Sequence, residues 1–251
     1  MISSSLKDLA SVYYFPPRWI PRHVLWINYA RVWSAAPFLR FYLNTAIITA
    51  GTIVGSVLSC SIVAYGFARL RAPGRRILFV IVLSTMMIPY QVTMIPLYVI
   101  FSKLKWIDTF KPLIVPAFFG TPFFIFLLRQ FYMTIPLEID DSLKIDGCGT
   151  FGIYWRMILP LARAALATVA IFSFMWTWNE LIRPLIYLQS TEKFTLALGL
   201  NFFRTAGSGY GTTEWNLLMA ASIITLVPCI VLFFFAQRYF IQGVVVTGVK
   251  G

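Results

Sequence analysis

The sequence predicts an all-α membrane protein, a polytopic helical bundle, on three observations. Five long apolar runs, almost free of charge, follow one another along the 251 residues. Charged residues make up 12% of the chain, about half the share that soluble domains carry. The mean hydropathy is +0.78. So little charge cannot coat a soluble globule of this size, and the membrane span is therefore the structural unit.

Each apolar run is long enough to cross the bilayer, because about 20 mostly apolar residues span the hydrocarbon core. The predicted spans are approximately residues 41–68, 77–102, 112–134, 161–188 and 215–237. The third span includes Arg129, whose side chain can reach the headgroups by snorkelling. Residues 41–241 thus form one membrane domain. An external segment, residues 1–40, precedes it, and a cytoplasmic tail, residues 242–251, follows it.

Small residues and prolines mark the interior of these spans. Gly51 and Gly55 in the first span match the GxxxG pattern, which favours close helix packing. Pro89 and Pro96 lie within the second span. Membrane helices tolerate proline where neighbouring groups satisfy the freed carbonyls, so these residues do not argue against a span.

The orientation follows from one loop. Residues 69–76 contain four arginines in eight positions, which is typical of a cytoplasmic loop. Because successive spans alternate sides, residues 130–163 and the tail should share the cytoplasmic side. The Lys and Arg count is nearly even between the two sides, so the orientation depends on this dense loop. The segments expected outside are residues 1–40, 103–111 and 189–214.

The composition excludes several function classes. A net charge of +12 would suit a nucleic-acid partner, but the basic residues lie between apolar runs and form no stripe on one element. They are better explained by anionic membrane lipid. A single histidine, His23, and three scattered cysteines predict no metal site and no disulfide framework. The tail approaches a phosphate-binding loop, but its Lys250 is one position late and no Ser or Thr follows. We therefore expect no catalytic residue and no cofactor bound by this chain.

The most informative polar segment lies between the third and fourth spans, at residues 136–160. Pro136 suits the first turn of a helix, and acids in that turn are favoured by the helix dipole. The three acids are Glu138, Asp140 and Asp141. Gly147 ends this helix, since glycine readily adopts positive φ. Residues 151–158 then predict a second, apolar and aromatic helix.

Two short helices with a glycine joint are thus expected at the cytoplasmic surface. A helix resting on lipid is one alternative. The clustered acids argue against it, because an anionic leaflet would repel them. A protein partner fits the segment better.

This segment resembles the EAA loop of importer-type ABC permeases. The pattern of that family, EAA, two residues and DG, aligns with residues 141–147. The matching or aligned positions, with the nearby acid Glu138, are Glu138, Asp141, Ser142, Leu143, Asp146, Gly147, Tyr154, Met157, Leu159 and Pro160. Ser142 and Leu143 depart from the two alanines of the family, and Leu143 adds bulk at a position where a small residue usually packs. The resemblance continues along nearly the whole chain, closest to the maltose-transporter-like second permease. Further matching stretches are residues 28–29, 44–45, 64–69, 73–75, 87–89, 95–98, 126–130, 178–180, 219–221, 237–238 and 249–251.

The resemblance implies a permease subunit for binding-protein-dependent sugar uptake in a bacterial or archaeal plasma or inner membrane. Such a chain pairs with a second permease as a heterodimer, with two ATPase subunits and with an extracytoplasmic sugar-binding protein. ATP and Mg would belong to the ATPase, and residues 136–160 would couple it to the spans. The family has six spans. Residues 1–7 resemble the outer end of such a first helix, and we expect that the start is assigned too late or that the chain is truncated.

Trp178, Asn179 and Glu180 form a candidate translocation path near the end of the fourth span, because ionisable groups inside a membrane are often functional. The alternative pairs Glu180 with Arg183 on one helix face. Two other function classes also stay open: a secondary transporter or channel without an ATPase, and a structural membrane scaffold. The acid-rich loop argues against both. The sequence does not identify the sugar or the partner subunits.

Overall fold

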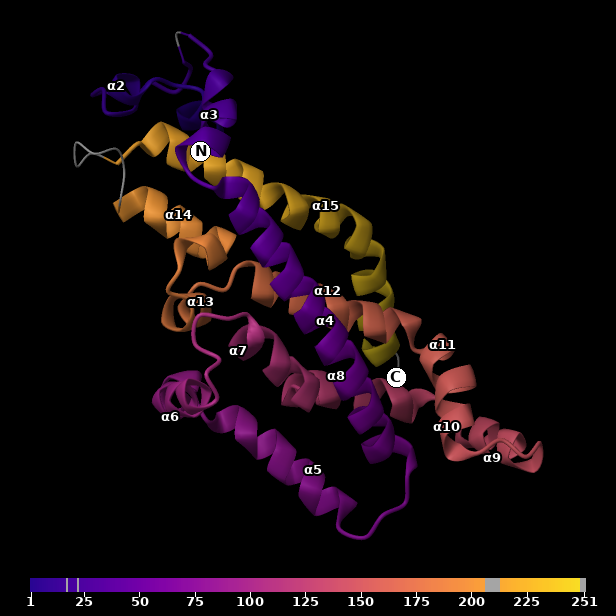
Figure 1. Cartoon of the computed structure of the whole chain (residues 1–251). Helices are drawn as coiled ribbons and strands as arrows, with labels where there is room; N and C mark the ends of the chain where they lie inside the picture. The colour runs from indigo at the N-terminus through magenta and orange to yellow at the C-terminus, as the bar shows by residue number, and fades with distance from the viewer. Residues whose placement is uncertain (17, 22, 206–212, 249–251) are drawn as a thin grey trace. The chain divides into compact units, whose positions relative to one another are not determined.

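The computed structural model describes residues 1–16, 18–21, 23–205 and 213–248, and every regular element among them is a helix (Figure 1). Three stretches are long and apolar enough to cross a membrane: Phe38–Arg69, Lys111–Thr134 and Trp215–Gln237. Two bent helix pairs raise the number of spans to five if each pair is one span. The predicted polytopic helical bundle is confirmed.

The three straight spans correspond to the first, third and fifth predicted runs. α4 (Phe38–Arg69) is one continuous helix. The third span is built from α7 (Lys111–Ile114), the 3₁₀ turn η2 (Val115–Phe119) and α8 (Pro122–Thr134). α15 (Trp215–Gly248) continues beyond the fifth span into the predicted tail. The last three positions of that tail, residues 249–251, lie outside the described residues.

The second and fourth predicted spans are both bent. α5 (Arg75–Ser84) continues into η1 (Thr85–Met87) and meets α6 (Tyr90–Lys103) at 97°. Pro89 stands in extended backbone immediately before α6, and it restricts Ile88 to the same region, so the helix cannot continue through this point.

The fourth predicted run is preceded by a helical segment that meets it at a bend. α10 (Thr150–Ile153), the π-helical turn η3 (Tyr154–Ile158) and α11 (Leu159–Leu161) meet α12 (Arg163–Trp178) at 76°. Pro160 lies in α11, before the bend. α12 ends at Trp178, and the remainder of the expected run forms a separate short helix, α13 (Ile182–Tyr187). The other short helices are α1 (Ile2–Ser5), α2 (Leu9–Val12), α3 (Ile27–Ala35), α9 (Leu137–Ile145), η4 (Thr191–Lys193) and α14 (Leu196–Thr205).

The described residues divide into two compact units. The first contains residues from Met1–Ile48, Ile107–Phe110 and Met175–Phe235. The second contains Thr49–Trp106, Lys111–Phe174 and the part of α15 from Ala236.

The second unit has a core in which α4, α8 and α10–α12 meet. Fully or nearly fully buried residues of that core include Cys60, Ala64, Phe124, Leu128, Tyr132, Ile153, Tyr154, Ile158 and Val169. The GxxxG prediction is confirmed in the same unit. A Cβ on Gly51 would lie 2.9 Å from Ile114 Cγ2, and one on Gly55 would lie 2.7 Å from Phe118 Cδ2. Only glycine allows α4 to approach its neighbour so closely.

Candidate functional site

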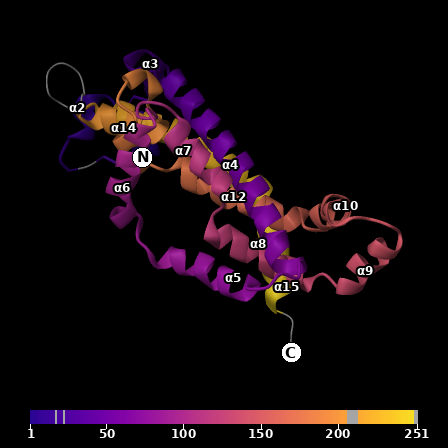
Figure 2. The same ribbon diagram turned by 60° about the horizontal axis from the view of Figure 1, so that its bottom comes forward.

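The predicted two-helix segment at residues 136–160 is confirmed. α9 begins after Pro136, with Glu138 and Asp140 in its first turn and Lys144 in its last. In Figure 2, α9 and α10 form a protrusion on the right of the view, beyond the ends of α8 and α12. The acids in the first turn of α9 and the lysine in its last turn complement the helix dipole, so the sequence favours a helix even in such a short segment.

The joint of the segment is Gly147, whose φ is +79°. Its N–H donates to the Lys144 carbonyl at 3.0 Å, and the next N–H, of Cys148, donates to Leu143 at 2.9 Å. This pair of bonds is the Schellman arrangement, which requires the left-handed conformation that glycine adopts without strain. The turn to α10 is therefore set by one residue.

One face of the segment is open to solvent. Among Glu138 and the residues that align with the EAA pattern, the exposed ones are Glu138, Asp141, Ser142, Asp146, Gly147 and Pro160. Asp141 Oδ1 accepts a hydrogen bond from Lys144 Nζ at 2.8 Å, which lowers the pKa of that carboxyl. Large apolar side chains are exposed beside the acids. They are Leu137, Ile145, Phe151 and Trp155. A surface with both exposed acids and exposed aromatic or aliphatic groups is suited to a protein partner.

The opposite face packs inward. Tyr154 is buried, and its hydroxyl lies 2.7 Å from Ser61 Oγ on α4. Leu143 and Leu159 are half-buried and pack against the core. Met157 is also half-buried, but it does not belong to the core cluster. The bulk that Leu143 adds to the pattern is thus accommodated in the second unit's core.

A buried ion pair joins α9 to α4, and sequence reasoning missed it. Arg69 Nη1 lies 3.7 Å from Asp140 Oδ1, and the two side chains are 2% and 7% exposed. Arg69 Nη2 also donates to the Ile135 carbonyl at 2.7 Å. The sequence suggested only that Arg69 was a loop charge and Asp140 a dipole acid. One available signal was helical spacing, because Asp140 shares a face with the inward-facing Leu143.

The structure places the three residues of the candidate translocation path at the end of α12, in the first unit. Trp178 is 4% exposed, donates from Nε1 to the Thr225 carbonyl at 3.1 Å and packs edge-to-face on Tyr42. Asn179 is exposed, and its amide donates to the Met175 carbonyl at 2.8 Å.

Glu180 makes the contacts of the structural alternative. Its Oε2 pairs with Arg183 Nε at 2.9 Å, and its Oε1 accepts the N–H groups of Ile182 and Arg183 at 3.1 and 3.4 Å. These bonds satisfy the first backbone donors of α13, as an N-terminal cap does. A contact with substrate stays a prediction.

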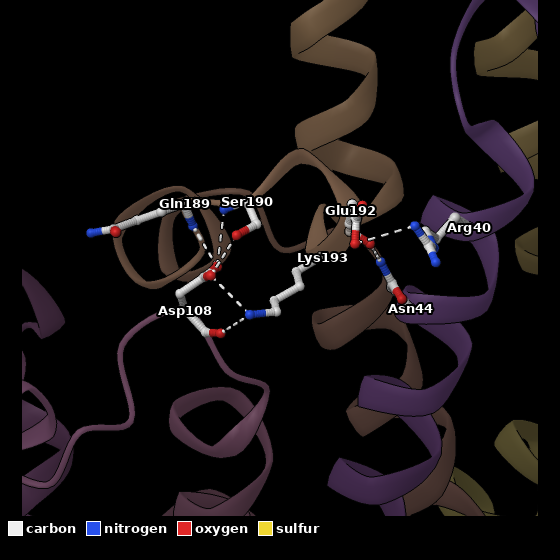
Figure 3. Close-up of polar contacts among 7 residues, drawn as sticks. All are labelled: Arg40, Asn44, Asp108, Gln189, Ser190, Glu192 and Lys193. Carbon is white, nitrogen blue, oxygen red and sulfur yellow. Dashed lines mark hydrogen bonds and ion pairs between the residues drawn. The ribbon is translucent and has the colours of Figure 1, made fainter.

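A second polar cluster, absent from the sequence predictions, surrounds Asp108 in the first unit (Figure 3). Its carboxylate accepts the N–H groups of Gln189 and Ser190, each at 3.0 Å, and hydrogen bonds from Ser190 Oγ and Lys193 Nζ. Burial raises the pKa of Asp108, but these hydrogen bonds outweigh it and hold the pKa well below its usual range.

The same figure shows a neighbouring connection to α4. Asn44 Nδ2 donates to the carbonyls of Glu192 and Phe194 at 2.8 and 3.0 Å, and Arg40 pairs with Glu192 at 3.4 Å. Segments expected on the outer side therefore contact one another within the first unit. Arg69 and residues 135–140, which are expected on the inner side, contact one another within the second unit. Both sets of contacts agree with the alternation of spans, while the orientation itself stays a prediction.

Within the described part of the chain, no group of three or more His, Cys, Asp or Glu residues is placed to hold a metal ion.

Comparison with known proteins identifies relatives along most of the chain. Residues 48–246 match the family model described as the binding-protein-dependent transport system inner membrane component. AraQ, a permease protein of the arabinooligosaccharides transport system, is 37% identical in Halalkalibacterium halodurans, with 87% of this chain and 76% of the relative covered. The Bacillus subtilis protein of the same name is 34% identical, with 92% and 81% covered. UgpE, a permease protein of the sn-glycerol-3-phosphate transport system of Yersinia pestis, is 30% identical, with 97% and 88% covered.

A solved structure supports the helical arrangement. A chain from a bacterial ABC transporter involved in the import of the acidic polysaccharide alginate superposes with a TM-score of 0.85 and 24% identity. The superposition covers 95% of this chain and 88% of the other. At that identity the likeness concerns the fold.

Proposed function

Because the chain belongs to the family of inner-membrane components of binding-protein-dependent transport systems, we propose that it forms half of the translocation pathway of an ATP-driven carbohydrate importer. It is a multi-pass membrane permease, and its energy would come from a separate ATPase.

The observation that supports this proposal most strongly is the exposed face of α9 and its joint. Acids and large apolar groups stand together there, on a segment expected at the cytoplasmic surface. Two ATPase subunits would bind ATP and Mg, and one of these subunits would bind the exposed face of α9. Closure of the ATPase pair would displace α9 and so change access to the pathway. We assign the coupling role to Glu138, Asp141, Ser142, Leu143, Asp146, Gly147, Tyr154, Met157, Leu159 and Pro160.

The remaining partners follow from the architecture of such systems. A second permease would complete the pathway as a heterodimer, and an extracytoplasmic binding protein would deliver the solute. Trp178, Asn179 and Glu180 stay candidates for the path itself. Relatives are named for arabinooligosaccharides and for sn-glycerol-3-phosphate, so we propose a carbohydrate or a carbohydrate derivative as the solute.

The test is purification of the tagged chain from its native membranes, followed by reconstitution with the proteins that accompany it. We expect an ATPase and a second permease to co-purify. In proteoliposomes with ATP on the ATPase side, and with the binding protein outside, uptake should require ATP hydrolysis. The solutes to compare are an arabinooligosaccharide, sn-glycerol-3-phosphate and an alginate oligosaccharide. Uptake driven by an ion gradient without an ATPase would instead support a secondary transporter.

A further inference from the structure

The C-terminal end of α4 carries three polar side chains at intervals of four residues: Ser61, Tyr65 and Arg69. Positions four apart lie one above another on a helix, so these side chains share one face. We call this set the α4 polar stripe. Polar groups are unusual at such positions in an apolar helix, and each needs a partner when it is buried.

All three members of the stripe find partners in the coupling segment or at its entry. Ser61 Oγ lies 2.7 Å from Tyr154 OH, and Tyr65 OH donates to the Thr150 carbonyl at 3.1 Å. Arg69 donates to Ile135 at 2.7 Å and pairs with Asp140 at 3.7 Å. These contacts lie on both sides of the Gly147 joint, so α4 is attached to α9 and to the helix that follows it.

The Arg69–Asp140 pair is the strongest sign that the attachment is specific. Both groups are almost fully buried, and ionised groups in that environment lose much of their hydration. Apolar residues at both positions would pack without that loss. A buried pair instead fixes orientation, because each charge needs the other. Its separation of 3.7 Å exceeds the roughly 2.7–2.9 Å of a charge-assisted hydrogen bond, so the contact at Asp140 Oδ1 is an ion pair without a hydrogen bond.

We propose that the α4 polar stripe is a set of positioning residues that transmits displacement of the coupling segment to α4, with Arg69–Asp140 as its principal link. This inference rests on the proposed function. A force on the exposed acids of α9 reaches α4 through Asp140, and a rotation at Gly147 reaches it through Thr150 and Tyr154. The exposed face receives the ATPase, and the buried face passes the movement on.

The test uses the complete purified transporter in proteoliposomes and measures solute molecules taken up per ATP hydrolysed. The informative variant is the double substitution Arg69→Gln with Asp140→Asn, which removes both charges and leaves two amides that can pair. Each single substitution would leave one buried charge without its partner and would reduce the amount of folded protein. The double variant should assemble with its ATPase and hydrolyse ATP, but its uptake per ATP should fall about tenfold. Arg69→Lys, which keeps the charge, should recover part of that loss.

Glu192→Gln is the matched control. It removes the exposed ion pair with Arg40, which lies outside the stripe, and should leave uptake per ATP unchanged. A second variant, Tyr65→Phe combined with Ser61→Ala, removes the two hydroxyl groups of the stripe and keeps the aromatic ring at position 65. It should also lower uptake per ATP, so the inference can be decided even if the double charge variant fails to assemble.

The outcomes separate the two proposals. If the wild-type transporter takes up no solute with ATP, the proposed function is wrong and this inference falls with it. If the wild-type transporter is active and both stripe variants keep the wild-type uptake per ATP, the inference alone is overturned. Loss of folded protein together with unchanged uptake per ATP in the remaining fraction would show a purely structural role.

Discussion

Replacing Gly147 with valine should uncouple ATP hydrolysis from uptake while the protein still reaches the membrane. Gly147 has a φ of +79°, and an added Cβ would meet no atom within 4 Å. The substitution therefore places its Cβ without a clash with neighbouring atoms. Its whole effect comes from forcing a residue with a branched side chain into the left-handed region, or from moving the joint out of that region.

The magnitude follows from the backbone. The left-handed conformation costs an L-residue about 1–2 kcal/mol, and β-branching places valine at the upper end. That strain is enough to shift the population of the native joint by a factor of about 5–30. Leaving the left-handed region would relieve it, but would break the bonds from Gly147 to Lys144 and from Cys148 to Leu143 and would redirect α10. The free energy of unfolding should fall by no more than this strain, because the joint is exposed and no packing is lost.

Gly149 offers a matched control two residues away. Its φ of −70° and ψ of 163° are open to any residue, and an added Cβ there also meets nothing within 4 Å. Gly149→Val should therefore keep normal coupling. Gly147→Asn should fall between the two valine variants, since asparagine tolerates the left-handed region.

The assay is uptake per ATP hydrolysed in proteoliposomes, with assembly checked by co-purification of the ATPase. We expect the order wild type, Gly149→Val, Gly147→Asn and Gly147→Val, from most to least coupled. Equal coupling in the two valine variants would refute the assignment of the joint to Gly147. A reversed order of Asn and Val at position 147 would refute the backbone argument itself.

Three further predictions follow from the other contacts. Asp108→Ala should lower the free energy of unfolding by about 1–3 kcal/mol, seen as a reduced Tm in detergent, because the residue accepts several hydrogen bonds as a charged group. The pKa of Asp108 is lower in the folded state than its ordinary value of 3.8, so the charged carboxylate stabilises the fold fully above that pH. This stabilisation is lost as the pH falls from there toward the folded-state pKa. A Tm difference between wild type and Asp108→Ala that persists unchanged at pH 2 would contradict this. Gly55→Ala should destabilise by about 1–3 kcal/mol, because the new Cβ lies 2.7 Å from the Phe118 ring and 3.2 Å from the Ala117 backbone; Gly66→Ala, which meets nothing within 4 Å, is the control for the Tm measurement. Glu180→Gln should lower the free energy of unfolding by about 0.5–1 kcal/mol, seen as a reduced Tm, and leave uptake near normal, because the contacts of Glu180 are those of a cap and an ion pair. Lost uptake with normal assembly would favour the translocation path.

Local chemistry made the coupling segment predictable. Pro136, the acids after it and Gly147 each constrain the backbone within a few positions, and the structure has the helix, the joint and the second helix in that order. The close approach at Gly51 and Gly55 was predictable for the same reason, since the spacing of small residues is visible in one helix.

Contacts between distant residues were not predictable in this way. Asp108 meets partners about 80 residues further along the chain, and its own φ of +58° has no marker in the neighbouring sequence. Arg69 and Ile135 are 66 residues apart. An arginine at the end of a span has the same sequence context whether it faces headgroups or pairs with a buried acid. The bend at Pro89 was ambiguous because the bilayer tolerates proline within a span.

The arrangement of residues along α4 suggests why a small displacement of α9 need not be absorbed locally. At Gly51 and Gly55 the helix is packed with its backbone close to Ile114 and Phe118, so it has little room to bend there. Nearer its C-terminal end, the polar stripe fixes it to the coupling segment at several points. Held by close packing at one level and by polar contacts at the next, α4 would move as a rigid body under the proposed coupling. The glycine pair and the polar stripe would therefore act together to transmit the displacement along α4. Gly55→Ala should accordingly lower uptake per ATP as well as Tm.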